Sequence, residues 1–436
     1  MEVLIESRKM VGPRAIMPGH LRRYSISSID QLQATGYVRL LLIYHPVNAS
    51  AFDCGSVRLL EESLAEALTI YYPLAGRYVE DGCYIDCGGQ GVELVEAKVN
   101  GHLDRLTSLG QVPDADLLDQ LSTFPDSVVE SPLFVIQVNK FEGGGLALGL
   151  RFTHRVADFH TIITFVNAWA MICRGCNPGE VVTPNFDVSC IFPPKNSVIN
   201  YPFLRKPGSD KLVMHRFTVS GETLAQLAIE TTSDEPDMKF KGYGRPSRME
   251  MAFALLCKAL VKIDRDKNPC ARPIAIGFSM NLRGRTRVAI PDAGFGNIFT
   301  LTLDFPSSTG DEEWNLHGYI KMVREILRKT KARYGAVGTA DELWSMVEED
   351  AKRRVRILAS GKYCLVSCTS WCRFPVYGID FGWGGPELVV CCRTPFRTNV
   401  LMDRKGDGGI DAWVVLDEEE MAKFKGDEDI IKHCVF

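Results

Sequence analysis

The stretch "LALGLRFTHRVADFHTIITFVNAWAMI" at residues 146–172 changes its hydrophobic period in the middle. Leucine or phenylalanine stands at every second position from 146 to 152, which predicts a β-strand. His154 continues this apolar row, so we expect its imidazole to point inward. From Phe159 onward, apolar residues recur every three or four positions, as on one face of a helix. Asp158 stands where this helix is expected to begin.

Strand-like and helical segments alternate on both sides of this junction. The glycines at 143–145 separate two strand-like runs and predict a hairpin that leads into His154. The expected strands cover residues 37–45, 83–87, 91–99, 132–141, 146–154, 212–220, 273–283, 365–371, 386–392 and 410–416. The expected helices cover residues 57–72, 159–172, 223–232, 247–263, 312–334 and 417–425.

The length of 436 residues exceeds what one hydrophobic core usually serves, so we expect two domains of roughly 200 residues each. Residues 186–212 contain prolines, asparagines and a glycine without a sustained period, as is typical of an exposed connection. We therefore expect an N-terminal domain at 1–185, a linker at 186–212 and a C-terminal domain at 213–436.

The composition is that of an ordinary globular protein, with 46% hydrophobic and 24% charged residues. A net charge of −4 gives no electrostatic footprint for nucleic acid or for acidic membranes. The N-terminus lacks the layout of a secretory signal, and the longest apolar stretch is far too short to span a bilayer. We expect a cytoplasmic monomer with no nucleic-acid or membrane partner.

Fourteen cysteines are scattered along the chain, which favours reduced thiols. Cys173 and Cys176 have the spacing of metal ligands, but a structural zinc site needs about four ligands and a second such pair is missing from the sequence. We expect no metal, and packing at a helix end is the expected role of this pair.

His154 and Asp158 form an HxxxD pattern that allows two interpretations. A histidine at a strand end is a general base if a substrate hydroxyl reaches its ring nitrogen within about 3 Å, whereas a histidine satisfied in the core does no chemistry. Asp158 is either part of the site or the N-cap of the helix. The pattern alone is too short to decide between them.

The stretch "DFGWG" at 380–384 is more specific. With it, the chain resembles the BAHD family of plant acyl-CoA-dependent acyltransferases over nearly its whole length. The other matching segments are "YYPLAGR" at 71–77, "HRVAD" at 154–158, "PSRMEMAFALLCKAL" at 246–260, "NLRGR" at 281–285 and "FGN" at 295–297. The segments "YSISSIDQ" at 24–31 and "FDVSCIFPP" at 186–194 are most similar to the vinorine synthase-like branch, which acetylates hydroxyls of alkaloids and other specialised metabolites.

The resemblance implies an α/β fold of two similar mixed-sheet domains of the chloramphenicol acetyltransferase type. A long crossover joins them, and a channel between them admits CoA from one side and the acceptor alcohol from the other. His154 then deprotonates the acceptor hydroxyl, whose oxygen attacks the thioester directly, without an acyl-enzyme. Acetyl-CoA is a cosubstrate, and no cofactor is bound permanently.

The resemblance also assigns roles to further residues. Asp158 points away from the reacting atoms and pairs with Arg283, which fixes the turn that carries His154. Thr369 and Trp371 match residues near the developing oxyanion, although a hydroxyl and an indole that only satisfy the backbone explain both as well.

Two more segments have mainly structural interpretations. In "DFGWG", Asp380 is expected to be a turn-forming acceptor, with Gly382, Trp383 and Gly384 serving the fold outside the channel. Ser247 and Arg248 match a segment on the CoA side, where they would contact pantetheine or phosphate groups; a solvated helix start explains both equally well.

The sequence departs from the family pattern at two positions. Phe159 stands where the family usually has a small residue, so its ring either narrows the acyl path or packs into the core. Gly294 replaces the tyrosine of "YFGN", which favours acetyl-CoA over malonyl-CoA as the donor.

The leading hypothesis is acetyl transfer from acetyl-CoA to a hydroxyl of an alkaloid or a similar small metabolite. The alternatives are an acyltransferase that uses malonyl- or aromatic acyl-CoA, and a non-catalytic relative that keeps the fold as a binding or regulatory module. The presence of His154, Asp158 and Arg283 together argues against the last of these.

Overall fold

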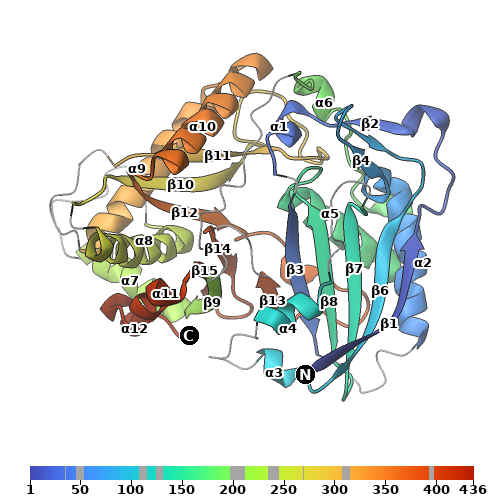
Figure 1. The fold of residues 1–436 in the computed structure, drawn as a ribbon, viewed down its shortest axis with the longest axis horizontal. Coiled ribbons are helices and arrows are strands. Elements are labelled where there is room, and N and C mark those ends of the chain that lie inside the picture. Colours follow the sequence, from blue (N-terminus) through green and yellow to red (C-terminus); the bar gives the residue numbers. More distant parts are fainter. Residues whose placement is uncertain are drawn as a thin grey trace. The chain divides into compact units, whose positions relative to one another are not determined.

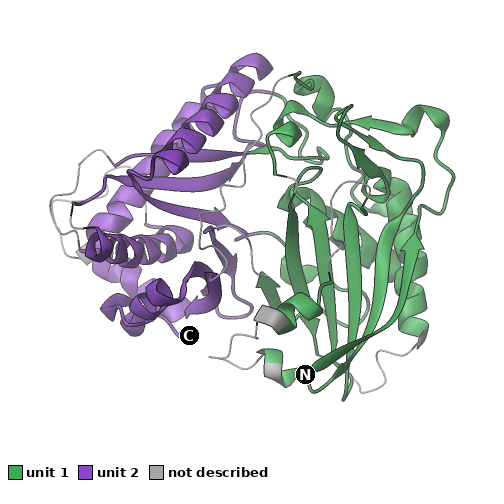
Figure 2. Ribbon diagram, viewed as in Figure 1, with its two compact units in different colours: residues 1–202, 289–299, 374–393 green, residues 203–288, 300–373, 394–436 purple. Residues whose placement is uncertain are grey.

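The computed structural model describes residues 1–34, 36–45, 54–107, 115–123, 131–196, 212–233, 245–268, 270–306, 315–391 and 397–436. The chain divides into two compact units, coloured separately in Figure 2. Unit 1 comprises Met1–Pro202, Ala289–Phe299 and Phe374–Arg393, and unit 2 comprises Phe203–Val288, Thr300–Arg373 and Thr394–Phe436. Each unit is therefore assembled from three separate segments. The expected linker at 186–212 lies partly outside the described residues, and the expected domain boundaries stay predictions.

Unit 1 is built on a six-stranded mixed sheet with the order β1-β6-β7-β8-β3-β13 (Figure 1). In this order the strands are Glu2–Val11, Val92–Asn100, Phe134–Phe141, Leu146–Thr153, Tyr37–Tyr44 and Leu388–Cys391. β6 and β7 are parallel, whereas the other neighbours are antiparallel. β13 comes from the third segment of the unit and pairs Leu388 with Ile43 of β3.

Helices and a small second sheet complete unit 1. The small sheet has the order β2-β5-β4, with the strands Arg23–Ser25, Tyr84–Asp86 and Arg77–Val79. The helices are α1 Ser28–Gln31, α2 Cys54–Ile70, α3 Asp104–Thr107, α4 Ala115–Gln120, α5 Phe159–Cys173 and α6 Val188–Ile191. The Trp169 indole of α5 donates to the Leu60 carbonyl and the Ser63 hydroxyl of α2, both at 3.1 Å, which joins the two long helices.

The hairpin from β7 to β8 is confirmed, with Gly143 and Gly144 at positive φ in its turn. β8 ends at Thr153, so His154 lies one residue beyond the strand that was expected to include it. Every residue of β8 is buried. The period-2 pattern of its sequence is therefore not mirrored by alternating exposure, because both faces of this part of the sheet are covered.

Unit 2 contains a second six-stranded mixed sheet with the order β11-β10-β12-β14-β15-β9. In this order the strands are Phe299–Asp304, Ile274–Asn281, Cys364–Ser370, Asn399–Asp403, Ile410–Asp417 and Leu212–Val219. The helices are α7 Gly221–Ser233, α8 Arg248–Lys267, α9 Leu316–Gly335, α10 Ala340–Ser360, α11 Glu418–Lys425 and α12 Glu428–His433. The mixed α/β architecture is thus confirmed in both units. Within the described ranges, no helix is long and apolar enough to cross a membrane.

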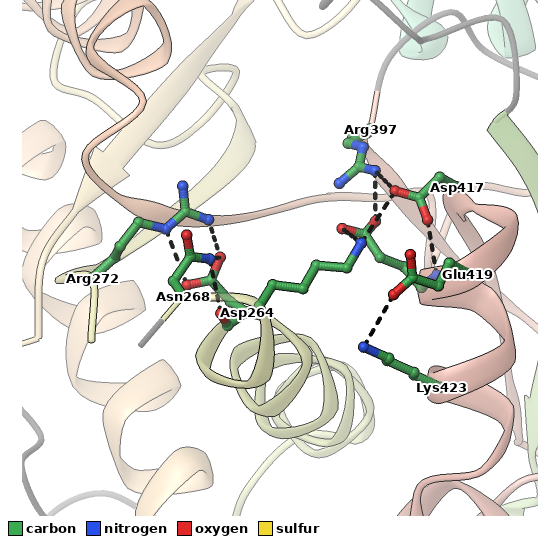
Figure 3. A network of polar contacts seen from close by, with 9 residues as sticks. Asp264, Asn268, Arg272, Arg397, Asp417, Glu419 and Lys423 are labelled. Atoms are coloured by element: carbon green, nitrogen blue, oxygen red, sulfur yellow. Dashed lines mark hydrogen bonds and ion pairs between the residues drawn. The ribbon is translucent and has the colours of Figure 1, made fainter. Parts of the chain in front are cut away.

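A polar network joins the end of α8 to the start of α11 in unit 2 (Figure 3). Arg272 pairs with Asp264, while Lys267 and Arg397 both reach Asp417 and Glu420. Although burial opposes ionisation, the Glu420 amide and the two cations lower the pKa of Asp417. The network thereby fixes the N-terminal end of α11, whose N-cap is Asp417.

Candidate active site

His154 lies in the short turn between β8 and α5. Its backbone N–H donates to the Gly36 carbonyl at 3.0 Å, which fixes the chain where it leaves the sheet. The residue is only partly exposed. The ring of Phe299 packs on the imidazole, with centroids 5.3 Å apart and planes tilted by 33°. Phe299 thus restricts the rotation of the imidazole.

Asn297 holds the Nδ1 side of His154. The Oδ1 atom of Asn297 lies 3.0 Å from Nδ1. The Nδ2 atom of Asn297 donates to Asp30 Oδ1 at 2.7 Å and to the His154 carbonyl at 2.8 Å. Because both amide hydrogens have acceptors, the amide oxygen faces the imidazole and Nδ1 must donate to it. The neutral ring then has a free lone pair on Nε2, as a general base requires.

Asp158 is the N-cap of α5, and it has a second task. Its Oδ1 accepts from the Thr161 N–H at 2.9 Å, as in an ordinary cap. Its Oδ2 accepts from the Ile298 N–H at 3.0 Å. The Thr161 hydroxyl donates to the Gly296 carbonyl at 2.9 Å. The start of α5 therefore holds the chain by hydrogen bonds to Gly296 and Ile298, the residues on either side of Asn297.

Asp30 of α1 also forms hydrogen bonds with the segment that contains Asn297. Its Oδ1 accepts the backbone N–H of Asn297 at 2.6 Å in addition to the side-chain amide. Gly296 has φ of +119°, and a Cβ there would lie 3.2 and 3.3 Å from the two carboxylate oxygens of Asp30. Glycine is thus required for both the backbone conformation and the close approach. Two carboxylates, Asp30 and Asp158, fix the loop that presents Asn297 to His154.

The electrostatics of the site favour a neutral imidazole. Burial lowers the pKa of His154 below its usual value, against the Asp158 charge and the Asn297 hydrogen bond, which raise it. Burial raises the pKa of Asp30 to about 6, although its hydrogen bonds to Ser27 and Asn297 favour the carboxylate. His154 is therefore in the basic form near neutral pH.

Arg283 and Thr369 belong to unit 2. The Arg283 side chain is buried, and its backbone N–H donates to Asn281 Oδ1 at 3.0 Å. Because Asp158 belongs to unit 1, the pairing of Asp158 with Arg283 stays a prediction. The Thr369 hydroxyl is 2.6 Å from that of Ser279 on the neighbouring strand.

Trp371, Ser247 and Arg248 also lie in unit 2. Trp371 is buried, and its backbone N–H donates to the Leu401 carbonyl at 2.7 Å. The Ser247 hydroxyl caps α8 by accepting from the Glu250 N–H, and Arg248 pairs with Asp403 at 3.0 Å. The roles assigned to these residues toward an oxyanion or CoA stay predictions.

The "DFGWG" segment forms a tight turn in unit 1. Asp380 Oδ1 accepts from the N–H groups of Gly382 and Gly384, both at 2.8 Å, and both glycines have positive φ. The Trp383 ring stacks on Phe381 at 5.6 Å and meets Tyr44 of β3 edge to face at 6.2 Å. The segment thus anchors the chain to the sheet just before β13.

Phe159 is the first residue of α5 and is 8% exposed. Its ring packs edge to face against Phe374, with centroids 5.1 Å apart and planes at 89°. This contact is compatible with a wall of the acyl path and with core packing, so the effect of Phe159 on donor size stays a prediction.

The chain is similar to known acyltransferases in both sequence and fold. A model of the Transferase family matches residues 1–430. The chain is 32% identical to an acetyl-CoA-benzylalcohol acetyltransferase of Clarkia breweri, covering 99% of this chain and 100% of that protein. It is 31% identical to vinorine synthase of Rauvolfia serpentina, covering 95% and 94%. The crystal structure of vinorine synthase superposes with a TM-score of 0.82 at 26% identity, over 100% of this chain and 99% of the other.

The chain belongs to the BAHD family of acyltransferases. It is therefore an acyl-CoA-dependent O-acyltransferase of small-molecule acceptors, and the resemblance seen in its motifs is confirmed. The two mixed-sheet units are the BAHD fold.

Sequence reasoning missed the connection among three residues of this BAHD site. Asn297 and Gly296 were visible only as part of the "FGN" motif, and Asp30 only as part of "YSISSIDQ". Ser27 and Asp30 have the spacing of a capping box, which marks a helix start. That signal locates α1 but does not show that the second oxygen of Asp30 reaches Asn297.

Proposed function

We propose that this BAHD enzyme transfers an acetyl group from acetyl-CoA to a hydroxyl of an alkaloid or a similar small specialised metabolite. The observation that carries the mechanism is the bond from His154 Nδ1 to Asn297 Oδ1, which leaves Nε2 as the proton acceptor. The choice of an acetyl donor is supported by the similarity to the benzylalcohol acetyltransferase and by Gly294 in place of the tyrosine of "YFGN".

The proposed reaction passes through one tetrahedral intermediate. Nε2 of His154 takes the proton of the acceptor hydroxyl while the oxygen attacks the thioester carbonyl carbon. The C–S bond then breaks, and the leaving CoA thiolate recovers the proton from the imidazolium. The products are the acetyl ester and free CoA, and the imidazole is neutral again. No acyl group is attached to the protein at any stage.

The test is an assay of free-thiol release with acetyl-, malonyl- and benzoyl-CoA against a panel of hydroxylated alkaloids and simple aromatic alcohols. We expect acetyl-CoA to be preferred and His154→Ala to lower kcat by about 10²- to 10⁴-fold. His20→Ala, which removes an exposed histidine of the same unit, is the matched control. If His154→Ala keeps more than about a tenth of the wild-type rate, the proposal of direct general-base catalysis is wrong. If malonyl- or benzoyl-CoA is the preferred donor, the proposal of acetyl-CoA as the donor is wrong.

We further propose that the enzyme acts as a monomer in the cytoplasm. Light scattering of the purified protein and fractionation of cells that express it test these two statements. A dimer at micromolar concentration, or recovery in a membrane fraction, would contradict them.

A further inference from the structure

The carboxylate of Asp30 is shared between two tasks. Its Oδ2 accepts from the Ser27 N–H at 2.8 Å and the Ser27 hydroxyl at 2.7 Å, which completes the capping box of α1. Its Oδ1 accepts the two donors of Asn297. The cap needs only one oxygen, so the second is available to hold a residue more than 260 positions away in sequence. Asp30 is 1% exposed, and these four described donors are all neutral.

The helix that carries Asp30 is itself firmly anchored. The Gln31 side chain donates to the Lys195 carbonyl at 3.0 Å and accepts from the Lys195 N–H at 2.8 Å. The Arg155 guanidinium donates to the Gln31 carbonyl at 2.6 Å. Because Arg155 directly follows His154, the turn that carries the base and the helix that carries Asp30 are fixed to each other.

The orientation of the Asn297 amide decides which nitrogen of His154 is basic. If the amide were flipped, its NH₂ group would face Nδ1, and the ring would have to keep its proton on Nε2. A flip would also place the amide oxygen against Asp30 Oδ1, so that two acceptors would face each other without a hydrogen. Asp30, together with the His154 carbonyl, therefore makes the flipped state unfavourable, and of the two acceptors only Asp30 carries a charge.

We propose that Asp30 is a positioning residue of the general base, which acts through Asn297 to keep His154 in the tautomer with a free Nε2. This inference rests on the proposed role of His154. Asp30 touches no reacting atom, and its effect on catalysis passes through the orientation of one amide.

The test compares Asp30→Ala with Ser27→Ala. The Asp30 variant removes both carboxylate oxygens, whereas the Ser27 variant damages the same capping box and leaves Oδ1 on Asn297. We expect Asp30→Ala to lower kcat by about 10- to 100-fold, as a part of the general-base contribution, with the KM for acetyl-CoA changed less than about 2-fold. Ser27→Ala should keep kcat within about 3-fold of wild type, because Oδ1 is retained.

Two further readouts separate positioning from a loss of fold. In ¹⁵N-histidine-labelled protein, the His154 signals should show a protonated Nδ1 in wild type and Ser27→Ala, and a mixture of tautomers in Asp30→Ala. Asp30→Ala should also cost little further activity in an Asn297→Ala background, because the two residues act as one unit. Wild-type kcat with an unchanged tautomer in folded Asp30→Ala, or independent effects of the two substitutions, overturns the proposal.

If Asp30→Ala does not fold, Asp30→Asn gives the answer. Its amide has one acceptor oxygen for two pairs of donors, so either the Ser27 pair or the Asn297 pair loses its acceptor. If the Asn297 pair loses it, the His154 signals should show mixed tautomers and kcat should fall by about 5-fold or more; if the Ser27 pair loses it, Nδ1 should stay protonated and kcat should stay within about 3-fold of wild type. Mixed tautomers with full activity, or a large loss of kcat with an unchanged tautomer, overturn the proposal. An active His154→Ala enzyme would instead refute the proposed role of His154 as the general base, so that the two failures are distinguishable.

Discussion

At His154, the direction of the pKa shift fixes the expected pH profile. Burial lowers the pKa of the imidazole below 6.5, so the neutral base is present above that value and is lost as the pH falls through the lowered pKa. We expect kcat/KM to be level at neutral pH and its acid limb to have a midpoint below 6.5. Initial rates between pH 5 and 9, with acetyl-CoA and one acceptor, measure this. A midpoint above 6.5 would mean that a different group limits the reaction.

Phe159 provides a second prediction for a single residue. Its contact with Phe374 places two rings where α5 begins, directly after the turn of His154. If the ring narrows the acyl path, Phe159→Ala should raise benzoyl relative to acetyl transfer by about 5- to 150-fold, the range for relief of overpacking. Rates with both donors and one acceptor measure the ratio. An unchanged ratio with lower thermal stability would assign Phe159 to the core. Phe374→Ala is the matched control, because it removes the other ring of this contact.

At the scale of elements, the start of α5 is predicted to control the loop of Asn297. Asp158→Asn keeps an oxygen for the Thr161 cap but places an NH₂ group against the Ile298 N–H. We expect the loss of this one contact to lower the free energy of unfolding by about 1–3 kcal/mol, in addition to any loss of the predicted pair with Arg283, and kcat to fall with it. Chemical denaturation and steady-state rates measure the two effects. Thr161→Ser, which keeps the hydroxyl bond to Gly296, is the control and should retain both.

The predicted ion pair between Asp158 and Arg283 needs its own experiment. Breaking a buried pair commonly costs about 3–5 kcal/mol, because one charge is left uncompensated. Unfolding free energies of Asp158→Asn, Arg283→Gln and the double variant form a cycle that isolates the coupling between the two residues. Additive effects would refute the pair.

The turn of "DFGWG" is predicted to stabilise the attachment of β13 to the sheet. Trp383→Ala removes the ring that packs on Phe381 and Tyr44, and it should lower the free energy of unfolding by about 2–4 kcal/mol. Trp383→Phe keeps much of this packing and should lose less. Thermal denaturation and the acceptor KM measure the outcome. A stable Trp383→Ala variant with a selectively raised acceptor KM would show that the segment serves the substrate.

Two of the elements that sequence reasoning missed have an identifiable cause in their sequences. α10 was not predicted, because Asp350 occupies one of its buried positions and pairs there with Tyr334 and Arg333 of α9. β1 was missed because its apolar residues are consecutive at 3–5 and are followed by charges. The strongly periodic segments, such as α5 and α8, were predicted to within a few residues.

At the scale of the whole molecule, unit 1 depends on residues far beyond its first segment. A fragment of residues 1–202 contains β1, β6, β7, β8 and β3 but lacks β13, the "DFGWG" turn and Asn297. We expect it to aggregate or to unfold without a cooperative transition, as judged by calorimetry and size-exclusion chromatography. A monomeric fragment with a sharp melting transition would contradict this expectation.

Unit 1 is assembled from separate segments, which also explains why only part of the site could be predicted from the sequence. His154 and Asp158 stand in one motif, and local periodicity located His154 to within one residue of the end of β8 and Asp158 at the start of α5. The other two residues of the site come together with His154 only through the tertiary fold. Asn297 is 143 positions from His154, and Asp30 is 267 positions from Asn297. No local pattern carries information about such distant pairs.

The late position of β13 has a consequence for synthesis on the ribosome. β3, whose residues 40–43 are fully buried in the finished sheet, has an open edge until residues 388–391 have been made. At typical translation rates, the interval from the end of β8 to the end of β13 is roughly ten seconds to a minute. An apolar strand edge that waits this long invites pairing with other nascent chains. Chaperones that shield this edge during translation should therefore raise the yield of active enzyme.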